Sequence, residues 1–383
     1  RTSLSQLKPD LDLMFCAGVN HIFFHGTCYS PKNDEWPGWK FYASIDMSPT
    51  NSIWRDAPYF MQYVERCQSF LQWGQPDNDF LVYLPVRDMW RQRLAQGEEG
   101  LLMQFEIHSM DQKAPDFIRS ILEIDSLGYD CDYISDRYLL TTTCVDGLLQ
   151  TAAGTRYHAL IIPGSGRMPA ELKSHLDQLR RQGAHIIQGV DAARMRQAAR
   201  PEPLRADLGL RVIRRSNDTG HHYFIANLTP RDIDTTVPLT VSCARAVIAD
   251  PMTGEISPAQ LTGQGLHLAL RSGESRIVQT YRDGAGMTAA DTARPIPHPL
   301  RTKDLTDRPW TLTFVESAPR VDKTFRLERL QTWETLDDDS VKVTMGTGCY
   351  TTTFQLTKEQ AQQPWRIDLG DVRESARVYI NGQ

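Results

Sequence analysis

Two histidines and a phenylalanine alternate along an apolar segment near the start of the chain, and these residue types suit sugar binding. His21, Phe23 and His25 occupy every second position after Val19, so an extended strand would point the three side chains to one side. Imidazoles hydrogen-bond hydroxyl groups in either direction, and flat aromatic rings stack on the apolar faces of pyranoses. The spacing predicts a buried strand that presents these groups at its end.

A loop rich in aromatic residues follows the predicted strand. Its tyrosine and tryptophans complete the predicted sugar-binding set, which is His21, His25, Tyr29, Trp36 and Trp39. The same residues fit another interpretation, in which the histidines are hydrogen-bonded core residues and the tryptophans anchor the loop. The position of the aromatic residues in a loop favours the sugar site, because binding residues concentrate in loops.

Apolar residues at helical spacing flank this segment on both sides. They predict a short helix over residues 4–16 and a longer one over 52–72, which Gly74 ends. A (β/α)8 barrel is built from eight units of strand and helix, about 250 residues in all. Residues 1–76 are long enough for one such unit.

The order of short motifs along residues 17–79 resembles glycoside hydrolase family 106. The motifs are AGVNH (17–21), FHG (24–26), YSP (29–31), WPGW (36–39), FYAS (41–44), NSIWRD (51–56), RCQSFL (66–71) and GQPDND (74–79). That family comprises large bacterial α-L-rhamnosidases in which a (β/α)8 barrel precedes accessory domains. The resemblance implies that residues 1–76 are the last unit of the catalytic barrel.

The resemblance also implies a substrate, and it implies that the catalytic residues lie outside this chain. The substrate would be a terminal rhamnose of plant or microbial polysaccharides or glycosides. The two catalytic carboxyl groups would lie on barrel strands upstream of Arg1, so none is assigned here. Calcium could act in the full-length enzyme, but no acidic cluster with calcium spacing, and no cofactor site, is recognised in this chain. The location would be secreted, periplasmic or at the cell surface.

Residues 77–200 alternate between strand and helix patterns. Asp79–Val86 is a nearly continuous apolar run, typical of a strand buried on both faces. Strands over 129–134, 159–162 and 184–188 and helices over 116–127 and 169–182 predict a parallel α/β sheet. The pattern resembles the flavodoxin-like, amidotransferase-like domain of several glycosidases. Ser165 stands where that fold has a nucleophile, but no G-x-S-x-G motif surrounds it, so we expect a structural role.

The remaining residues predict β structure in two blocks. Short strands over 210–214, 222–227, 237–241, 246–248 and 266–270 indicate a β-sandwich in residues 201–281. His221 and His222 would face opposite sides of one strand. Prolines mark residues 282–308 as a linker. Residues 309–383 resemble the first half of a galactose-binding-like jelly roll, which ends in a strand and an Asn381-Gly382 hairpin turn.

Composition limits the kinds of molecule that the chain is expected to bind. It has 383 residues, which predicts more than one domain, and its net charge of -5 argues against nucleic acid as a partner. No apolar run is long enough to span a membrane. Seven scattered cysteines without a C-x-x-C pair predict free, mostly buried thiols rather than a disulfide framework or a zinc site. The oligomeric state is open.

Three functions are therefore weighed. The first is part of a glycoside hydrolase, most concretely an α-L-rhamnosidase, to which this chain contributes one wall of the sugar site. The second is a noncatalytic carbohydrate-binding or scaffold protein. The third is an amidotransferase-like enzyme, which the missing motif around Ser165 disfavours. A lone fragment with one barrel unit is expected to be inactive by itself.

Overall fold

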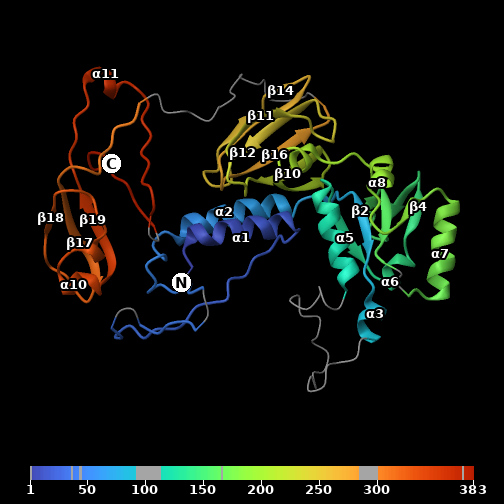
Figure 1. The fold of residues 1–383 in the computed structure, drawn as a ribbon, viewed down its shortest axis with the longest axis horizontal. Coiled ribbons are helices and arrows are strands. Elements are labelled where there is room, and N and C mark those ends of the chain that lie inside the picture. Colours follow the sequence, from blue (N-terminus) through green and yellow to red (C-terminus); the bar gives the residue numbers. More distant parts are fainter. Residues whose placement is uncertain are drawn as a thin grey trace. The chain divides into compact units, whose positions relative to one another are not determined.

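A computed structural model describes residues 2–35, 38–42, 45–91, 114–164, 167–283, 301–372 and 375–383. Together these form a mixed α/β structure with several sheets. The chain divides into two compact units. Unit 1 comprises Arg1–Lys8, Ile22–Gln62 and Pro297–Gln383, and unit 2 comprises Pro9–His21 and Tyr63–Ile296. Each unit is described by itself below (Figure 1).

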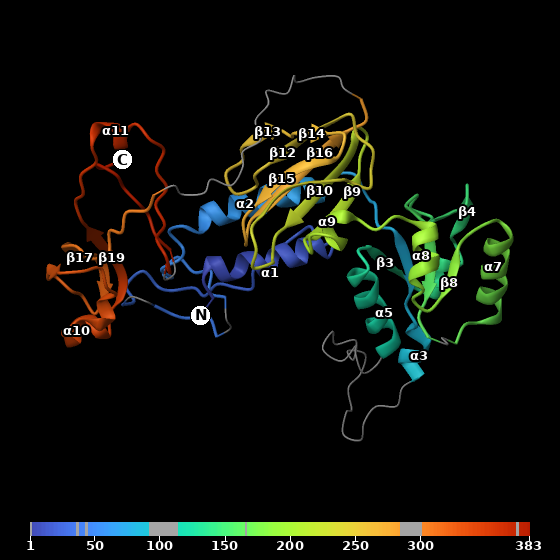
Figure 2. The same ribbon diagram turned by 45° about the horizontal axis from the view of Figure 1, so that its top comes forward.

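Both helices that the sequence predicts near the start of the chain are present, and the first has the predicted bounds. Helix α1 spans Leu4–Cys16, and helix α2 spans Ala57–Leu71. Helix α2 starts later than expected because overlapping turns occupy the preceding residues. Within unit 2 the two helices lie side by side (Figures 1 and 2), and Tyr63 of α2 donates a hydrogen bond to the fully buried Asp12 of α1. The Tyr63 hydroxyl also lies 2.9 Å from the Ser275 hydroxyl.

The parallel sheet of unit 2 confirms the predicted α/β pattern. Its order is β3-β2-β7-β8, with all neighbours parallel. Alternate residues of the central strand β2 enter different cores: Phe80 packs in the core that includes Phe117, and Leu81 in the core that includes Leu172. Both faces are therefore covered, which explains the continuous apolar run. The elements are β2 (Phe80–Tyr83), α3 (Val86–Arg91), α5 (Pro115–Ser126), β3 (Cys131–Ile134), α6 (Asp136–Leu139), β7 (Ala159–Ile162), α7 (Ala170–Arg181), β8 (Ile186–Gln188) and α8 (Ala192–Ala198).

A small antiparallel sheet beside it was not predicted. It consists of β4 (Thr143–Val145), β5 (Leu148–Gln150) and β6 (Arg156–Tyr157). Asp146 and Gly147 connect the first two strands with φ values of 53° and 81°. Those angles suit a two-residue hairpin turn, for which Asp-Gly is a preferred sequence. The strands are too short to show a clear alternation in the sequence.

Two antiparallel sheets share one core in the second half of unit 2. Tyr223 and Val278 of the six-stranded sheet pack with Leu266 and Leu268 of the three-stranded sheet. One predicted strand, 237–241, is wrong: β11 ends at Val237. Pro238 follows, and proline cannot donate to a strand ladder. The orders are β1-β9-β10-β16-β12-β13 and β11-β15-β14, formed by β1 (Gln75–Pro76), β9 (Arg211–Ser216), β10 (Gly220–Ala226), β11 (Ile233–Val237), β12 (Arg245–Ala249), β13 (Ile256–Pro258), β14 (Leu261–Thr262), β15 (Gly265–Leu270) and β16 (Ser275–Tyr281), with helix α9 (Pro203–Ala206) before β9.

His221 and His222 point to opposite faces of β10, as predicted. His222 is 1% exposed, and its ring stacks on Trp73 at a centroid distance of 5.1 Å and an angle of 7°. Burial lowers the pKa of His222 to about 4, so the ring is neutral at pH 7. It is a packed core histidine.

Unit 1 holds a three-stranded antiparallel sheet with the order β18-β17-β19. Leu312 and Val341 are fully buried in its core. Beyond Thr351 the chain is largely exposed, and the expected strand over 378–380 is not formed. The predicted Asn-Gly turn is present, because Ile380 and Gln383 exchange two backbone hydrogen bonds and Asn381 has a φ of 51°. The elements are β17 (Trp310–Ala318), β18 (Phe325–Leu327), the 3-10 helix η2 (Trp333–Thr335), α10 (Asp339–Lys342), β19 (Met345–Thr351) and α11 (Lys358–Ala361).

The cysteines are all free, as predicted, but the expectation that most are buried is wrong. Only Cys16 and Cys67 are buried, and Cys349 is exposed. The other four are partly exposed because they lie at sheet edges or in loops. Among the described residues, no helix has the length and apolar character needed to cross a bilayer.

Candidate functional site

The predicted strand around His25 belongs to none of the sheets formed by the described residues, but the Gly26 N–H donates to the Ile45 carbonyl at 3.4 Å and the Gly26 carbonyl accepts from the Met47 N–H at 3.0 Å. Every odd-numbered residue from 21 to 29 is exposed and every even-numbered one is half-buried, so the predicted alternation is present. The prediction of a buried strand is wrong, because the face with His25 and Tyr29 is open. Tyr29 is 76% exposed and Phe23 is 84% exposed. Side chains exposed to this degree can contact a ligand.

Aromatic rings gather around His25 within unit 1. The imidazole of His25 meets the ring of Phe41 edge to face at 4.9 Å, and Phe41 lies 4.8 Å from Tyr42. On the other side of the segment, Phe24 lies 6.5 Å from Phe60 of α2. The alternating segment is thus anchored by one face, while His25 joins an aromatic cluster on the other.

A hydrogen bond joins the backbone of Trp39 to Ser30, the residue that follows Tyr29. The Ser30 hydroxyl accepts a hydrogen bond from the Trp39 backbone N–H at 2.9 Å, and Trp39 is 60% exposed. Gly38 allows this approach: it has a φ of 70°, and a Cβ atom there would lie 2.6 Å from the Ser30 hydroxyl oxygen. Only glycine fits such a position without strain.

Three of the five predicted site residues belong to the same compact unit. His25, Tyr29 and Trp39 lie in one unit, on the extended segment and the loop that follows it. His21 is exposed and belongs to unit 2. Trp36 lies outside the described residues, as does Ser165 in the parallel-sheet region.

Two of the three acids near this loop are exposed, and the third is buried. Asp34 and Glu35 are exposed, as expected for loop acids. Asp46 is only 3% exposed, and one of its carboxylate oxygens accepts a hydrogen bond from the fully buried Ser48. Its other oxygen has no hydrogen-bond partner among the residues that the structure describes. No sequence pattern around Asp46 distinguishes it from Asp34.

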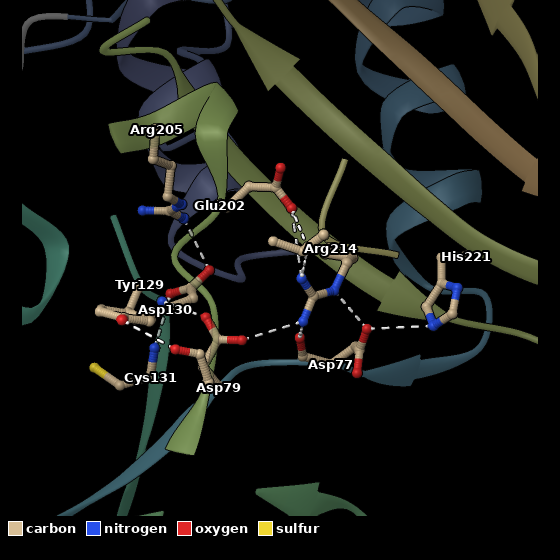
Figure 3. A network of polar contacts seen from close by, with 11 residues as sticks. Asp77, Asp79, Tyr129, Asp130, Cys131, Glu202, Arg205, Arg214 and His221 are labelled. Atoms are coloured by element: carbon tan, nitrogen blue, oxygen red, sulfur yellow. Dashed lines mark hydrogen bonds and ion pairs between the residues drawn. The ribbon is translucent and has the colours of Figure 1, made fainter. Parts of the chain in front are cut away.

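A second concentration of charge lies in unit 2, where the parallel sheet meets the antiparallel sheets (Figure 3). The Arg214 guanidinium contacts Asp77 at 2.5 Å, Asp79 at 3.3 Å and Glu202 at 3.5 Å. Arg205 contacts Asp130 at 2.8 Å. Within one connected network, acids that precede the parallel strands β2 and β3 are neutralised by Arg214 of antiparallel strand β9 and by Arg205 of helix α9.

Burial shifts the proton affinity of these acids. It raises the pKa of Asp79 and Glu202, and it raises the pKa of Asp130 to about 6 against the lowering effect of Arg205. Shifted values are common at active sites, but ion-pair networks in structural positions produce them as well. Here the carboxylates are held by arginine, hydroxyl and backbone groups, so we interpret the network as a structural junction.

No metal site is formed by the described residues alone. Nowhere in this part of the chain do three or more His, Cys, Asp or Glu side chains gather to hold an ion. Calcium takes six to eight oxygen ligands, and Asp46 is a single carboxylate. The residues described here do not fit a calcium site by themselves.

Two known proteins are similar to this chain. A curated protein of Formosa agariphila named "Putative beta-glucuronidase" is 26% identical over 184 residues, which are 48% of this chain and 14% of that protein. The solved structure of a rhamnosidase from Novosphingobium sp. PP1Y superimposes with a TM-score of 0.64 at 19% identity, over 93% of this chain and 36% of that one. The chain thus spans well under half the length of either relative, and the second likeness shows the fold alone.

The family comparison covers the aromatic segment itself. A family model described as alpha-L-rhamnosidase matches residues 2–200, just over half of the chain. The matched range includes α1, the segment with His25, Tyr29 and Trp39, α2 and the parallel sheet. The chain belongs to glycoside hydrolase family 106.

Proposed function

We propose that this chain is part of an α-L-rhamnosidase, to which it contributes one wall of the sugar site and accessory domains. The observation that carries the proposal is the family match over residues 2–200, because that range contains the exposed aromatic face. The rhamnosidase-like fold is consistent with it.

The residues proposed to bind the sugar are those named from the sequence: His21, His25, Tyr29, Trp36 and Trp39. Tyr29 and Trp39 expose flat rings that can stack on a pyranose, and the methyl group of a deoxyhexose suits an aromatic wall. The His25 imidazole can donate a hydrogen bond to a sugar hydroxyl or accept one from it. These contacts bind and orient the substrate.

The proposal assigns the bond-breaking groups to residues outside this chain. Glycoside hydrolysis uses two carboxyl groups about 5 to 9.5 Å apart across the scissile bond. Near the aromatic face, Asp34 and Glu35 are exposed and Asp46 is buried against Ser48, so no such pair is seen there in the described residues. In the same way, any calcium would take most of its ligands from elsewhere.

The arrangement of the remaining domains is part of the same proposal. Residues 1–76 would complete a (β/α)8 barrel, the parallel sheet would be an amidotransferase-like accessory domain, and residues 309–383 would belong to a galactose-binding-like domain. The proposal includes a secreted, periplasmic or cell-surface location, which is inferred from the family resemblance.

The experiment that tests the function is a substrate comparison on the natural protein from its source. Its intact mass is first compared with the 43.5 kDa of this chain. The protein is then assayed with p-nitrophenyl α-L-rhamnoside and p-nitrophenyl β-D-glucuronide. Turnover of the rhamnoside alone supports the proposal, whereas turnover of the glucuronide alone would assign the substrate suggested by the name of the Formosa relative.

Sugar binding separates the proposal from its noncatalytic alternative. If neither substrate is turned over, titration with L-rhamnose decides between a carbohydrate-binding protein and a scaffold. Binding without turnover, by a natural protein no larger than this chain, would refute the hydrolase.

A further inference from the structure

Residues near the carboxyl end of unit 1 contact the turn that precedes helix α2. The Nε and Nη2 atoms of Arg377 each lie 2.7 Å from one carboxylate oxygen of Asp56, and Nη2 donates to the Arg55 carbonyl at 3.0 Å. The Ser375 hydroxyl donates to the other Asp56 oxygen at 2.7 Å. Both oxygens of Asp56 are therefore held by residues more than 300 positions later in the chain.

Asp56 is well suited to be held in this way. Its side chain is only 16% exposed, and it directly precedes the first residue of α2. Burial by itself would raise the pKa of Asp56, but the hydrogen bonds from Ser375 and Arg377 and the arginine charge outweigh this and lower it. The carboxylate is charged at neutral pH, and its orientation is fixed from both sides.

A series of hydrogen-bonded turns leads from Asp56 toward the aromatic face. The Asp56 N–H donates to the Ile53 carbonyl at 3.1 Å, and the Asn51 N–H donates to the Ser48 carbonyl at 2.9 Å. The Asn51 side chain donates to the Asp46 carbonyl at 2.6 Å and lies 3.5 Å from the Ile53 N–H. Residues 46–56 thus form one connected piece.

That piece is joined to the residues that carry the proposed sugar contacts. The Ser48 hydroxyl accepts a hydrogen bond from the Cys28 N–H at 3.2 Å, directly before Tyr29. The next residue, Ser30, holds the backbone of Trp39 at 2.9 Å. Hydrogen bonds and a few peptide links therefore connect Arg377 to Tyr29 and Trp39 within one unit.

We propose that Ser375 and Arg377 are positioning residues for the aromatic face, acting through Asp56 and the turns over residues 46–56. The pair is partly exposed, and such ion pairs add little to global stability. Its effect is instead local, because contiguous hydrogen-bonded networks transmit coupling between distant groups. The segment Ser375–Gln383 thereby shapes the sugar site although it carries none of its contacts.

Hydrogen exchange on the complete protein tests the positioning without reference to activity. In R377A we expect amide exchange over residues 27–30 and 46–56 to rise roughly 2- to 10-fold, with the melting temperature unchanged. Arg366 is an exposed arginine that precedes this segment in the sequence, so R366A is the control and should exchange like the wild type. Unchanged exchange in R377A would overturn the proposal.

Further variants distinguish the geometry from charge alone. R377K keeps the charge but not the two-pronged contact, so it should restore only part of the protection. D56N and R377Q should each raise exchange, and the double variant should raise it no further than either single change. Additive effects would show that the two residues act separately, which would also overturn the proposal.

The effect of Arg377 on the sugar site rests on the proposed function, and steady-state kinetics tests it separately. In the complete protein, R377A should raise KM for p-nitrophenyl α-L-rhamnoside roughly 2- to 10-fold with kcat nearly unchanged. If the wild type does not act on this substrate, the proposed function fails while the exchange experiment still decides the positioning. Raised exchange with unchanged KM in an active enzyme would refute the effect on the site.

Discussion

The hydroxyl group of Ser48 uses its full hydrogen-bonding capacity in a buried position. It donates to the Asp46 carboxylate, accepts from the Cys28 N–H and lies 3.3 Å from the Thr27 hydroxyl. Ser48 has no exposed surface, so a lost contact there cannot be replaced by bulk water. This single side chain connects the segment with Tyr29 to the buried acid of the loop.

Replacing Ser48 by alanine should destabilise the protein measurably. The change leaves the buried Asp46 carboxylate without its donor, which costs about 1–3 kcal/mol. Urea unfolding followed by circular dichroism measures the loss. Ser52 is exposed and makes only a 3.5 Å contact with Asn51, so S52A serves as the control; equal effects of the two changes would contradict the role given to Ser48.

The exposed tryptophan of the site gives a prediction about sugar affinity. W39A removes a proposed stacking platform, which is worth about 0.5–1.5 kcal/mol, so KM for the rhamnoside should rise about 2- to 10-fold. Steady-state kinetics of the full-length enzyme checks this. Trp365 is also partly exposed but lies on another segment, and W365A should leave KM unchanged. If the two variants behave alike, Trp39 does not bind the sugar.

At the scale of elements, the junction in Figure 3 explains why strands of two different sheets stay together in unit 2. Asp77 and Asp79 border the parallel sheet, whereas Arg214 lies on β9 of an antiparallel sheet. Arg214 is 12% exposed and meets three carboxylates. Their charges are tolerable in this buried position only while the guanidinium is present.

R214M should therefore destabilise the protein by about 3–5 kcal/mol, because it leaves buried carboxylates without a counter-charge. The shift of the urea unfolding midpoint measures the effect. Arg320 pairs with Asp322 at 2.8 Å but is 82% exposed, so R320A should shift the midpoint very little. A small effect of R214M would mean that the carboxylates are hydrated or protonated when the guanidinium is absent.

The same junction predicts a dependence on pH. The pKa of Asp130 is raised to about 6, from 3.8 in an unfolded chain, so the folded protein keeps this proton between about pH 4 and 6 while the unfolded chain releases it. Stability due to Asp130 therefore falls as the pH rises through this window, by at most about 3 kcal/mol.

The measurement compares wild type and D130N at pH 4.5 and pH 7. The stability of the wild type relative to D130N should be greater at pH 4.5, because asparagine does not titrate. Titrating groups present in both proteins, such as His222, contribute equally to the pH dependence of both stabilities, so their contributions cancel in the difference. A difference that stays constant with pH would show that Asp130 is ionised throughout.

The sequence predicts elements well where burial is periodic and poorly where contacts are distant. Helix α1 and strand β7 have the predicted bounds, because each presents a regular apolar pattern to a core. The segment around His25 alternates as predicted, but it lies outside the sheets formed by the described residues. The contact between Arg377 and Asp56 cannot be predicted from a local sequence pattern, because the two residues lie 321 positions apart.

At the scale of the whole molecule, the seven free cysteines differ in reactivity. Burial raises the pKa of Cys16 and Cys131, which disfavours the reactive thiolate, whereas Cys349 is exposed. We expect iodoacetamide to label Cys349 first in the native protein and all seven thiols after unfolding. Peptide mass spectrometry identifies the sites, and C349S should lose the fast phase. Fewer than seven thiols in the unfolded, unreduced protein would indicate a disulfide.

The stacked pair of Trp73 and His222 gives the molecule an optical reporter of its own. A protonated imidazole quenches the emission of an adjacent indole, and a neutral one does so far less. Because the His222 pKa is about 4, Trp73 should emit brightly at neutral pH and dim only in acid, and separation of the pair should abolish this quenching by acid. Comparing the fluorescence of wild type and W73F would then follow the opening of this region during unfolding, with no label attached.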